Sequence, residues 1–359
     1  MDDKTLSELI ALTRLYPGAP RKVKEVLEHY GSAHEALGHS ELPNTEEALR
    51  AGEKEVEFVH RHRVRTWFYQ DDAYPTRLRQ CSDCPVLLYT SGHVEMDGGH
   101  MLSIVGTRAA TEGGKELTRR IVLELAAAVP DLTIVSGLAY GIDVAAHRAA
   151  IETGIPTLIV PAHGLDRIYP SVHRPVAVAA LEHGGIVTEY PSGTTPLQGN
   201  FVARNRIVAG LSDAVLVVES KARGGALITA SMANDYDREV LAVPGRPSDM
   251  CSEGCNRLIR DNKAHLVGSA EDILSVLMWS ETPQRAHAVQ TSLVEMSMSL
   301  SETGRRLLEL LRTAPDGIHI NNIVMETGLS YQDVAAELMT MELESLVRSL
   351  PGGVYRTLC

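Results

Sequence analysis

The sequence predicts an α/β fold, with a doubly wound, mostly parallel sheet in the middle of the chain and helical segments on either side. Between residues 101 and 243, short apolar runs alternate with stretches of helical periodicity, which is the pattern of strand-helix-strand units. Nearly every apolar run ends in glycine or another small residue. Because ligands bind such sheets at the carboxyl ends of the strands, we expect a site at that edge.

Bulk composition favours a globular cytoplasmic protein of two or three domains, since the chain has 359 residues and 44% hydrophobic content. No run reaches the ~18 apolar residues of a membrane span, and the acidic N-terminus does not resemble a signal peptide. Five cysteines, an odd number, fit a reducing compartment. The net charge is −12, yet residues 100–270 hold 16 basic and 17 acidic residues, so a local basic pocket can exist there.

Residues 1–70 predict a small helical domain. Apolar residues recur at helical spacing on both sides of a Pro-Gly-Ala-Pro break at residues 17–20. Two short helices around such a turn resemble a helix-hairpin-helix or SAM-like unit. Units of this kind can bind a DNA backbone, but the acidic composition here favours a scaffold or protein-interaction role.

Residues 71–275 predict the sheet domain. A connector at 67–92 ends in a strand signal at 84–92. Helices are expected at 115–129, 142–152 and 174–182. The predicted buried strands are 102–105, 132–135, 157–160, 185–188, 214–218 and 240–243.

A polar linker is predicted at 276–300 and a separate winged-helix domain at 301–359. The order of elements predicts the winged helix: two helices at 304–312 and 320–327, a third from Ser330 to about residue 343, and a hairpin at the Pro-Gly-Gly turn. The third helix contains three acidic residues and neither Lys nor Arg. A duplex should repel it, so we expect this domain to serve protein contacts or regulation and not to bind DNA.

The segment before the strand at 214–218 offers an aromatic ring, two arginines and an asparagine. Phe201 has a face on which a base can stack, and Arg204 and Arg206 have planar forks that suit phosphate, with Asn205 between them. In the alternative interpretation, Phe201 belongs to the core and the arginines form surface ion pairs.

Glycine-rich turns follow several of the predicted strands. Such turns let backbone N–H groups approach a phosphate, and the next helix begins with its positive end toward the anion. Each turn alone is weak, but several at one edge, together with the segment at Phe201, favour a phosphate-and-base site. The residues concerned are Gly106, Thr107, Arg108, Ser136, Gly137, Lys221, Gly224, Gly225 and Thr229.

Two further groups have both a chemical and a structural interpretation. Asp143 and His147 are spaced to share a helix face and could act as an acid-base pair, but with no adjacent nucleophile we favour a structural pair that orders the glycine loop. Cys81-x2-Cys84 and Cys251-x3-Cys255 could form a zinc site. Reduced structural thiols are the favoured interpretation, and no metal or cofactor is expected.

The chain resembles the DNA-processing protein A family (DprA, also called Smf). The matching motifs are Tyr74-Pro75, Val105-Gly106-Thr107-Arg108, Ser136-Gly137-Leu138-Ala139-x-Gly141-Ile142-Asp143-x3-His147, Gly164-Leu165-Asp166-x2-Tyr169-Pro170, Phe201-x2-Arg204-Asn205-Arg206, Leu227-Ile228-Thr229-Ala230 and Val243-Pro244-Gly245. They occur in the family's order from about residue 74 to 267, and together they are very specific.

The resemblance implies an extended Rossmann-like fold that binds single-stranded DNA, forms a homodimer, protects incoming strands during natural transformation and loads RecA recombinase. It implies no enzyme. Carried over, Arg108, the Ser136-Gly137 turn and Gly224-Gly225 would hold phosphates. Phe201 would contact a base, with both nearby arginines in the pocket wall.

Two departures from the family pattern affect these expectations. The turn at 221–226 differs from the family's usual Ser-Gly-Ser-Leu form. Residues 258–264 replace the family's commoner glycine-alanine ending, near the expected dimer surface.

The competing hypotheses are a Rossmann-like glycosidase of nucleoside monophosphates and a nucleotide sensor. Such glycosidases need a carboxylate on the helix after the phosphate loop, and here that helix has no acid before Asp235.

Overall fold

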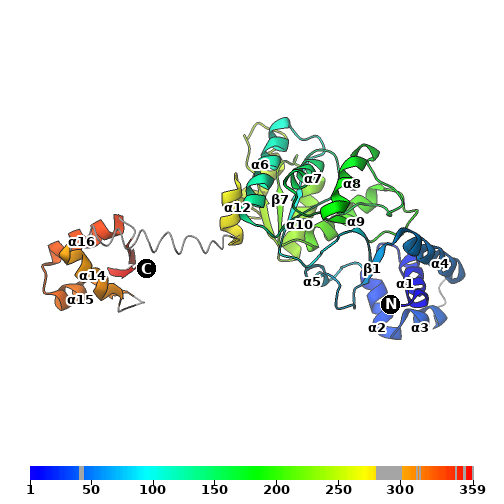
Figure 1. Cartoon of the computed structure of the whole chain (residues 1–359), viewed down its shortest axis with the longest axis horizontal. Coiled ribbons are helices and arrows are strands. Elements are labelled where there is room, and N and C mark those ends of the chain that lie inside the picture. Colours follow the sequence, from blue (N-terminus) through cyan, green and yellow to red (C-terminus); the bar gives the residue numbers. More distant parts are fainter. Residues whose placement is uncertain are drawn as a thin grey trace. The chain divides into compact units, whose positions relative to one another are not determined.

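The computed structural model divides the chain into two compact units, residues 1–280 and 281–359 (Figure 1). Each unit has its own hydrophobic core and is described by itself. The structure describes residues 1–39, 44–279 and 301–357, and in the last range it leaves out 313, 315, 316, 344, 345, 351 and 352. In the described part of the chain, no helix combines the length and apolar character needed to cross a membrane.

The first unit is built on a mixed sheet whose described strands have the order β1-β2-β6-β5-β4-β3-β7-β8-β9. β2 pairs antiparallel with β1 and β6, and the remaining pairs are parallel. This arrangement confirms the predicted doubly wound, mostly parallel sheet. The strands are Arg65–Phe68, Leu87–Gly92, His100–Val105, Leu132–Ser136, Thr157–Ile159, Gly185–Thr188, Ala214–Val217, Glu239–Ala242 and His265–Leu266.

Helices cover both faces of the sheet because the central strands are apolar on both sides. In β7, Ala214 and Leu216 face one core, and Val215 and Val217 face the other, as the two-residue period of a strand requires. One face packs against α6 (Glu112–Ala128), α7 (Ile142–Thr153), α8 (Arg174–His183) and α12 (Ala270–Leu277). The other packs against α5 (Thr76–Arg79), α9 (Gln198–Gly210), α10 (Gly225–Asp235) and α11 (Glu253–Arg260) (Figure 1).

Four helices precede the sheet and pack onto its edge. Their apolar faces form one cluster with residues of β2, so they belong to the same compact unit as the sheet. Buried Glu55 also accepts hydrogen bonds from the backbone N–H and the hydroxyl of Ser192. The helices are α1 (Asp3–Leu15), α2 (Pro20–Tyr30), α3 (Ala33–His39) and α4 (Thr45–His62).

The predicted helical region of residues 1–70 extends too far, because β1 at Arg65–Phe68 is already a strand of the sheet. Its residues pair with residues of β2 that lie 19 to 25 positions later in the chain, so no local pattern predicts this strand.

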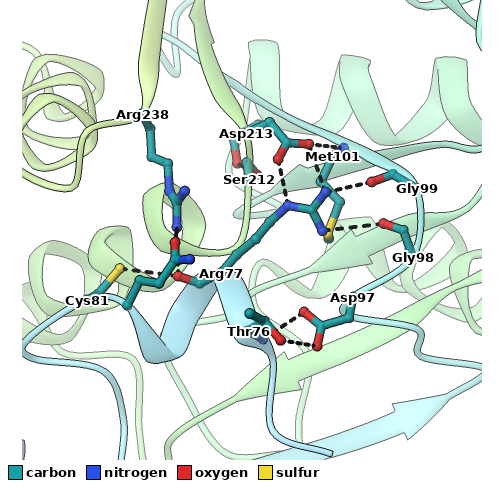
Figure 2. Close-up of polar contacts among 12 residues, drawn as sticks. Thr76, Arg77, Cys81, Asp97, Gly98, Gly99, Met101, Ser212, Asp213 and Arg238 are labelled. Carbon is teal, nitrogen blue, oxygen red and sulfur yellow. Dashed lines mark hydrogen bonds and ion pairs between the residues drawn. The ribbon is translucent and has the colours of Figure 1, made fainter. Parts of the chain in front are cut away.

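An arginine clamp aligns the amino ends of β3 and β7 (Figure 2). Arg77 of α5 forms a bidentate ion pair with Asp213, at 2.6 and 3.0 Å, and also donates to the Gly99 carbonyl at 2.6 Å. Asp213 in turn accepts from the Met101 backbone N–H at 2.9 Å. Bidentate pairs of this kind are geometrically specific, so the clamp fixes the relative position of the two strands whose opposite ends form the candidate site.

The second unit confirms the predicted winged-helix order. Ser330 accepts from the Asp333 backbone N–H and so caps the third helix, as expected. The linker predicted at 276–300 starts within α12, and from residue 280 it lies outside the described residues. The elements are α14 (Glu302–Arg312), β10 (Ile318–His319), α15 (Ile320–Thr327), α16 (Tyr331–Leu343), β11 (Val347–Leu350) and β12 (Val354–Thr357).

Candidate nucleic-acid interface

A pocket of about 620 Å³ opens at the carboxyl ends of β3 and β7. From β3 the chain proceeds through β4 and β5 toward one edge of the sheet, whereas β7 and β8 extend toward the other. The pocket therefore lies at the topological switch point, where doubly wound sheets bind ligands. The predicted residues that line it are Gly106, Thr107, Arg108, Phe201, Arg204, Asn205, Lys221, Gly224, Gly225 and Thr229.

The turn after β3 is held close to the end of β7. A side chain at Gly106 would overlap Ile142 of α7, so this close approach requires glycine. The next residue, Thr107, donates its backbone N–H to the Glu219 carbonyl at 2.8 Å. The turn thereby places the exposed side chain of Arg108 at the pocket.

The turn after β7 supplies the opposite wall. Lys221 and Arg223 are exposed and line the pocket. α10 begins directly after them, and no side chain caps its first turn at Gly224. Uncapped N–H groups at a helix start favour an anion, so this wall offers two cations and a positive helix end.

The rim of the pocket has excess positive charge. Among the described residues, neither Arg108 nor Lys221 nor Arg223 forms an ion pair or a hydrogen bond through its side chain. The Arg108 guanidinium lies over the Phe201 ring, 4.9 Å from its centroid, in a cation–π contact. Three cations without a carboxylate partner, beside an aromatic face, are suited to a ligand with phosphates and a ring.

The floor of the pocket is buried and held by internal hydrogen bonds. Arg204 is 4% exposed and donates from Nη1 to the Val160 carbonyl, and its guanidinium lies on Gly137, where any side chain would overlap it. Asp143 accepts from the backbone N–H groups of Gly137 and Ala139 at 3.2 and 3.4 Å. Burial raises the pKa of Asp143, and the Arg204 charge opposes that rise.

These contacts agree with a structural role for Asp143 in ordering the glycine loop. His147 bonds a different partner, Thr157 Oγ1, at 2.7 Å, and burial lowers its pKa to about 3. The two side chains do not form the acid-base pair that their spacing allowed, because each is committed to its own buried hydrogen bond.

Arg206 does not reach the pocket, which corrects the expectation for the pocket wall. It is 6% exposed and pairs with Glu189, whose side chain is 15% exposed, with Nη2 and Oε2 2.5 Å apart. The two arginines of α9 are two positions apart, about 200° around a helix, so they point to different sides. Arg206 is thus neither a phosphate ligand nor a surface ion pair.

Ser136 and Gly137 are likewise not available as phosphate ligands in this structure. Ser136 is the last residue of β4, is fully buried and donates its hydroxyl to the Ile104 carbonyl at 2.6 Å. Arg204 covers Gly137. In this structure a protein group already occupies the position that the resemblance gave to a phosphate.

Gln198 and Arg223 also line the pocket, although the site residues predicted from the sequence do not include them. Gln198, Phe201, Val202 and Asn205 follow the i, i+3, i+4, i+7 spacing of one helix face, so treating the segment as a helix would have grouped them. Arg223 stands two residues after Lys221 in the same glycine turn.

Within the described residues, the two cysteine pairs do not assemble a metal site. Cys81, Cys84 and Cys255 are buried free thiols, and burial raises the pKa of Cys81 to about 11 and that of Cys255 to about 12. Across the ranges that the structure describes, no three His, Cys, Asp or Glu side chains gather in a metal-binding group. The zinc alternative therefore has no site there.

Comparison with known proteins identifies the family. The model of DNA recombination-mediator protein A matches residues 65–278, and the model of the DprA winged helix domain matches residues 295–353. The chain belongs to the DNA recombination-mediator protein A family. Protein Smf of Synechocystis is 35% identical over 316 residues, which cover 80% of this chain and 78% of that protein.

Solved structures of the DprA family match as well. DNA processing protein A from Streptococcus pneumoniae aligns with a TM-score of 0.65 at 31% identity, covering 77% of this chain and 98% of that one. The protein from Helicobacter pylori, described by its single-stranded DNA binding mode, aligns with a TM-score of 0.54 at 29% identity and covers 60% and 95% of the two chains. The predicted family is confirmed.

Proposed function

We propose that this DprA-family chain binds single-stranded DNA in the pocket between the ends of β3 and β7. The observation that carries the proposal is a group of three cations, Arg108, Lys221 and Arg223, that have no ion-pair partner in the described part of the chain and surround the ring of Phe201 in that pocket. Single strands bind to sites that combine a positive groove with an aromatic stacking face. The similar protein from Helicobacter pylori, which is described as binding single-stranded DNA, supports the assignment.

Each side chain has a distinct part in this proposal. Arg108, Lys221 and Arg223 neutralise backbone phosphates, and the turn at Gly224 and Gly225 receives one of them at the start of α10. Phe201 contacts a base. Asn205 and Thr229 lie in the lining and supply polar contacts to base or sugar.

Arg204 and Asp143 act indirectly, by holding the loop that forms the pocket floor. Their hydrogen bonds are made without a ligand, so the floor is preorganised. A preformed floor reduces the conformational entropy that is lost when the strand enters.

The wider role is recombination mediation: protection of single strands and their transfer to RecA recombinase during transformation, by a cytoplasmic homodimer. Family membership supports these points. A protein that holds a single strand through phosphates and a few bases leaves other base edges free for a recombinase.

A nucleotide-cleaving enzyme is the competing function. The helix that starts at the phosphate turn, α10, contains one acid, Asp235, at its last residue, so no carboxylate reaches the pocket from that helix. The carboxylate in the lining, Asp143, is committed to the backbone of the glycine loop. This arrangement favours binding over glycosidic cleavage.

The test compares an oligothymidylate, a duplex of the same length and deoxynucleoside monophosphates in direct binding assays across salt. We expect preference for the single strand, with log K falling by about 2 per decade of salt for three neutralised phosphates. Equal duplex affinity contradicts the proposal. Release of free base from the monophosphates supports the enzyme, and tight mononucleotide binding without preference for oligomers supports the sensor.

A further inference from the structure

An exposed tyrosine lies beside the candidate pocket but outside its lining. Tyr169 belongs to the loop after β5, and 46% of its surface is exposed. Its ring centroid is 6.0 Å from that of Phe201, and the two planes are inclined by 54°. Aromatic residues make up only 4% of the chain, so two rings in contact at the edge that holds the candidate site require an explanation.

The backbone at Tyr169 is held by a buried histidine. His163 Nδ1 lies 2.8 Å from the Gly164 carbonyl, and its Nε2 accepts the Tyr169 backbone N–H at 3.1 Å. One neutral tautomer satisfies both contacts, with the proton on Nδ1. Burial lowers the pKa of His163, which favours the neutral ring that these two contacts require.

The same loop is fastened at two further points. Thr188 donates its hydroxyl to the His163 carbonyl at 3.0 Å, and Asp166 accepts the Gly193 backbone N–H at 2.9 Å. The Tyr169 ring thus projects from a fixed loop toward solvent. In the described part of the chain, its hydroxyl makes no hydrogen bond. The exposed ring is therefore not needed to satisfy a polar group of the fold.

The distance and angle between the two rings restrict which nucleic acids can place a base on each ring. Stacked bases in a duplex are about 3.4 Å apart, whereas these centroids are 6.0 Å apart and steeply inclined. Two neighbouring bases can contact both rings only after they unstack from each other. Unpaired nucleotides on a flexible backbone meet that condition, and a duplex does not.

We propose that Tyr169 is a second stacking platform of the site, receiving the base next to the one that contacts Phe201. The inference rests on the proposed function. It adds a direction: the strand leaves the pocket over the loop after β5. It also predicts a preference for thymidine tracts over adenine tracts, because weakly stacked pyrimidines unstack at lower cost.

The experiment measures oligothymidylate affinity of the full chain by fluorescence anisotropy for Tyr169→Leu, Tyr169→Phe and the wild type. Loss of one base stack should weaken binding of Tyr169→Leu about 5- to 100-fold, and Tyr169→Phe should stay within about twofold, since it keeps the ring. The control is Tyr331→Leu, which removes a similarly exposed tyrosine, 55% exposed, from the winged-helix unit. Unchanged affinity of Tyr169→Leu, or an equal loss in the control, overturns the inference.

A second measurement needs no variant. Wild-type protein is irradiated with an oligothymidylate carrying 5-iododeoxyuridine, and the adducts are mapped by mass spectrometry. An adduct at Tyr169 supports the platform, and adducts confined to other residues overturn it.

Failure of the proposed single-strand binding would give a different result from failure of the Tyr169 inference. If the wild type does not prefer single strands, the proposed function fails. If it does, and Phe201→Leu weakens binding while Tyr169→Leu does not, only the second platform is wrong.

Discussion

The carboxyl edge of the sheet and the third helix of the winged-helix domain have opposite charge patterns. At the pocket, Arg108, Lys221 and Arg223 are cations without carboxylate partners among the described residues. Helix α16 occupies the position of the recognition helix in DNA-binding winged helices. It carries Asp333, Glu337 and Glu342 and no Lys or Arg. Its buried residues, Val334, Leu338 and Met341, serve the core of its own domain.

The contrast shows why net charge is a poor guide to nucleic-acid binding in this chain. A formal charge of −12 repels DNA at long range, but affinity depends on cations that meet phosphates directly. Fold analogy alone would offer two candidate DNA-binding modules, the sheet domain and the winged-helix domain. The placement of charge supports the pocket in the sheet and opposes a DNA-binding role for the helix in the winged-helix domain.

The largest expected effect is on stability and concerns Arg206, the arginine of α9 that lies outside the pocket. Arg206→Met leaves the Glu189 carboxylate buried without its partner. Loss of one member of a buried ion pair costs about 3–5 kcal/mol of unfolding free energy, measurable by urea denaturation. The double variant Arg206→Met with Glu189→Met should recover most of that stability. A stable Arg206→Met protein that no longer binds single-stranded DNA would return this arginine to the site.

A second prediction concerns the ring at the pocket. Phe201→Ala should weaken single-strand binding by about 1–3 kcal/mol, because a stacked base loses its platform. Val202→Ala is the matched control, since it removes apolar surface from the adjacent lining position without removing a ring. Thermal denaturation of both variants checks the fold. Wild-type affinity in a folded Phe201→Ala protein would show that the ring serves packing alone.

The helical spacing of α9 explains which site residues the sequence could identify. The residue types in the Phe201 segment indicate a phosphate-and-base site, and the glycine turns indicate the edge of the sheet at which the pocket opens. The side each residue faces follows from the helix, which puts Asn205 in the lining and turns Arg206 to Glu189. Without the helix assignment, the sequence could not show which residues of this segment face the pocket and which face the core.

The strands show the same division between local and non-local information. The apolar runs predict the central parallel strands to within one or two residues at their ends, because burial on both faces makes each run continuous. Ser136 shares a face with Leu132 and Ile134, so the alternation in β4 already places it in the core. β1 could not be found locally, since Arg65–Phe68 becomes a strand only by pairing with β2.

A third prediction tests whether the pocket floor is structural, in contrast with its charged rim. The pKa of His147 is about 3 in the folded protein against 6.5 unfolded, so the unfolded chain takes up a proton first as the pH falls. Stability from this group is complete above pH 6.5 and is lost progressively as the pH falls toward 3. The slope reaches ~1.4 kcal/mol per pH unit.

The variant for this test is His147→Gln, which does not titrate. Urea unfolding between neutral and mildly acidic pH should show a shallower loss of stability in the variant than in the wild type. Parallel curves would mean that the imidazole is protonated as readily in the folded protein as in the unfolded chain.

The smallest expected effect concerns the winged-helix domain. A protein truncated before residue 281, the boundary between the two compact units, should keep single-strand affinity within about threefold, roughly 0.65 kcal/mol. A loss of tenfold or more in a folded truncated protein contradicts the comparison. Duplex binding by the isolated domain at physiological salt contradicts it as well.

The most direct measurement of the central claim is the salt dependence of oligothymidylate binding by a triple variant, Arg108→Gln, Lys221→Gln and Arg223→Gln. Its matched control is Lys54→Gln, Arg61→Gln and Arg63→Gln, which removes three exposed cations from helix α4 and its C-cap. If the pocket cations neutralise phosphates, the slope of log K against log salt should fall by about 2 in the pocket variant and stay unchanged in the control. An unchanged slope in the pocket variant, or an equal fall in both, would contradict the claim.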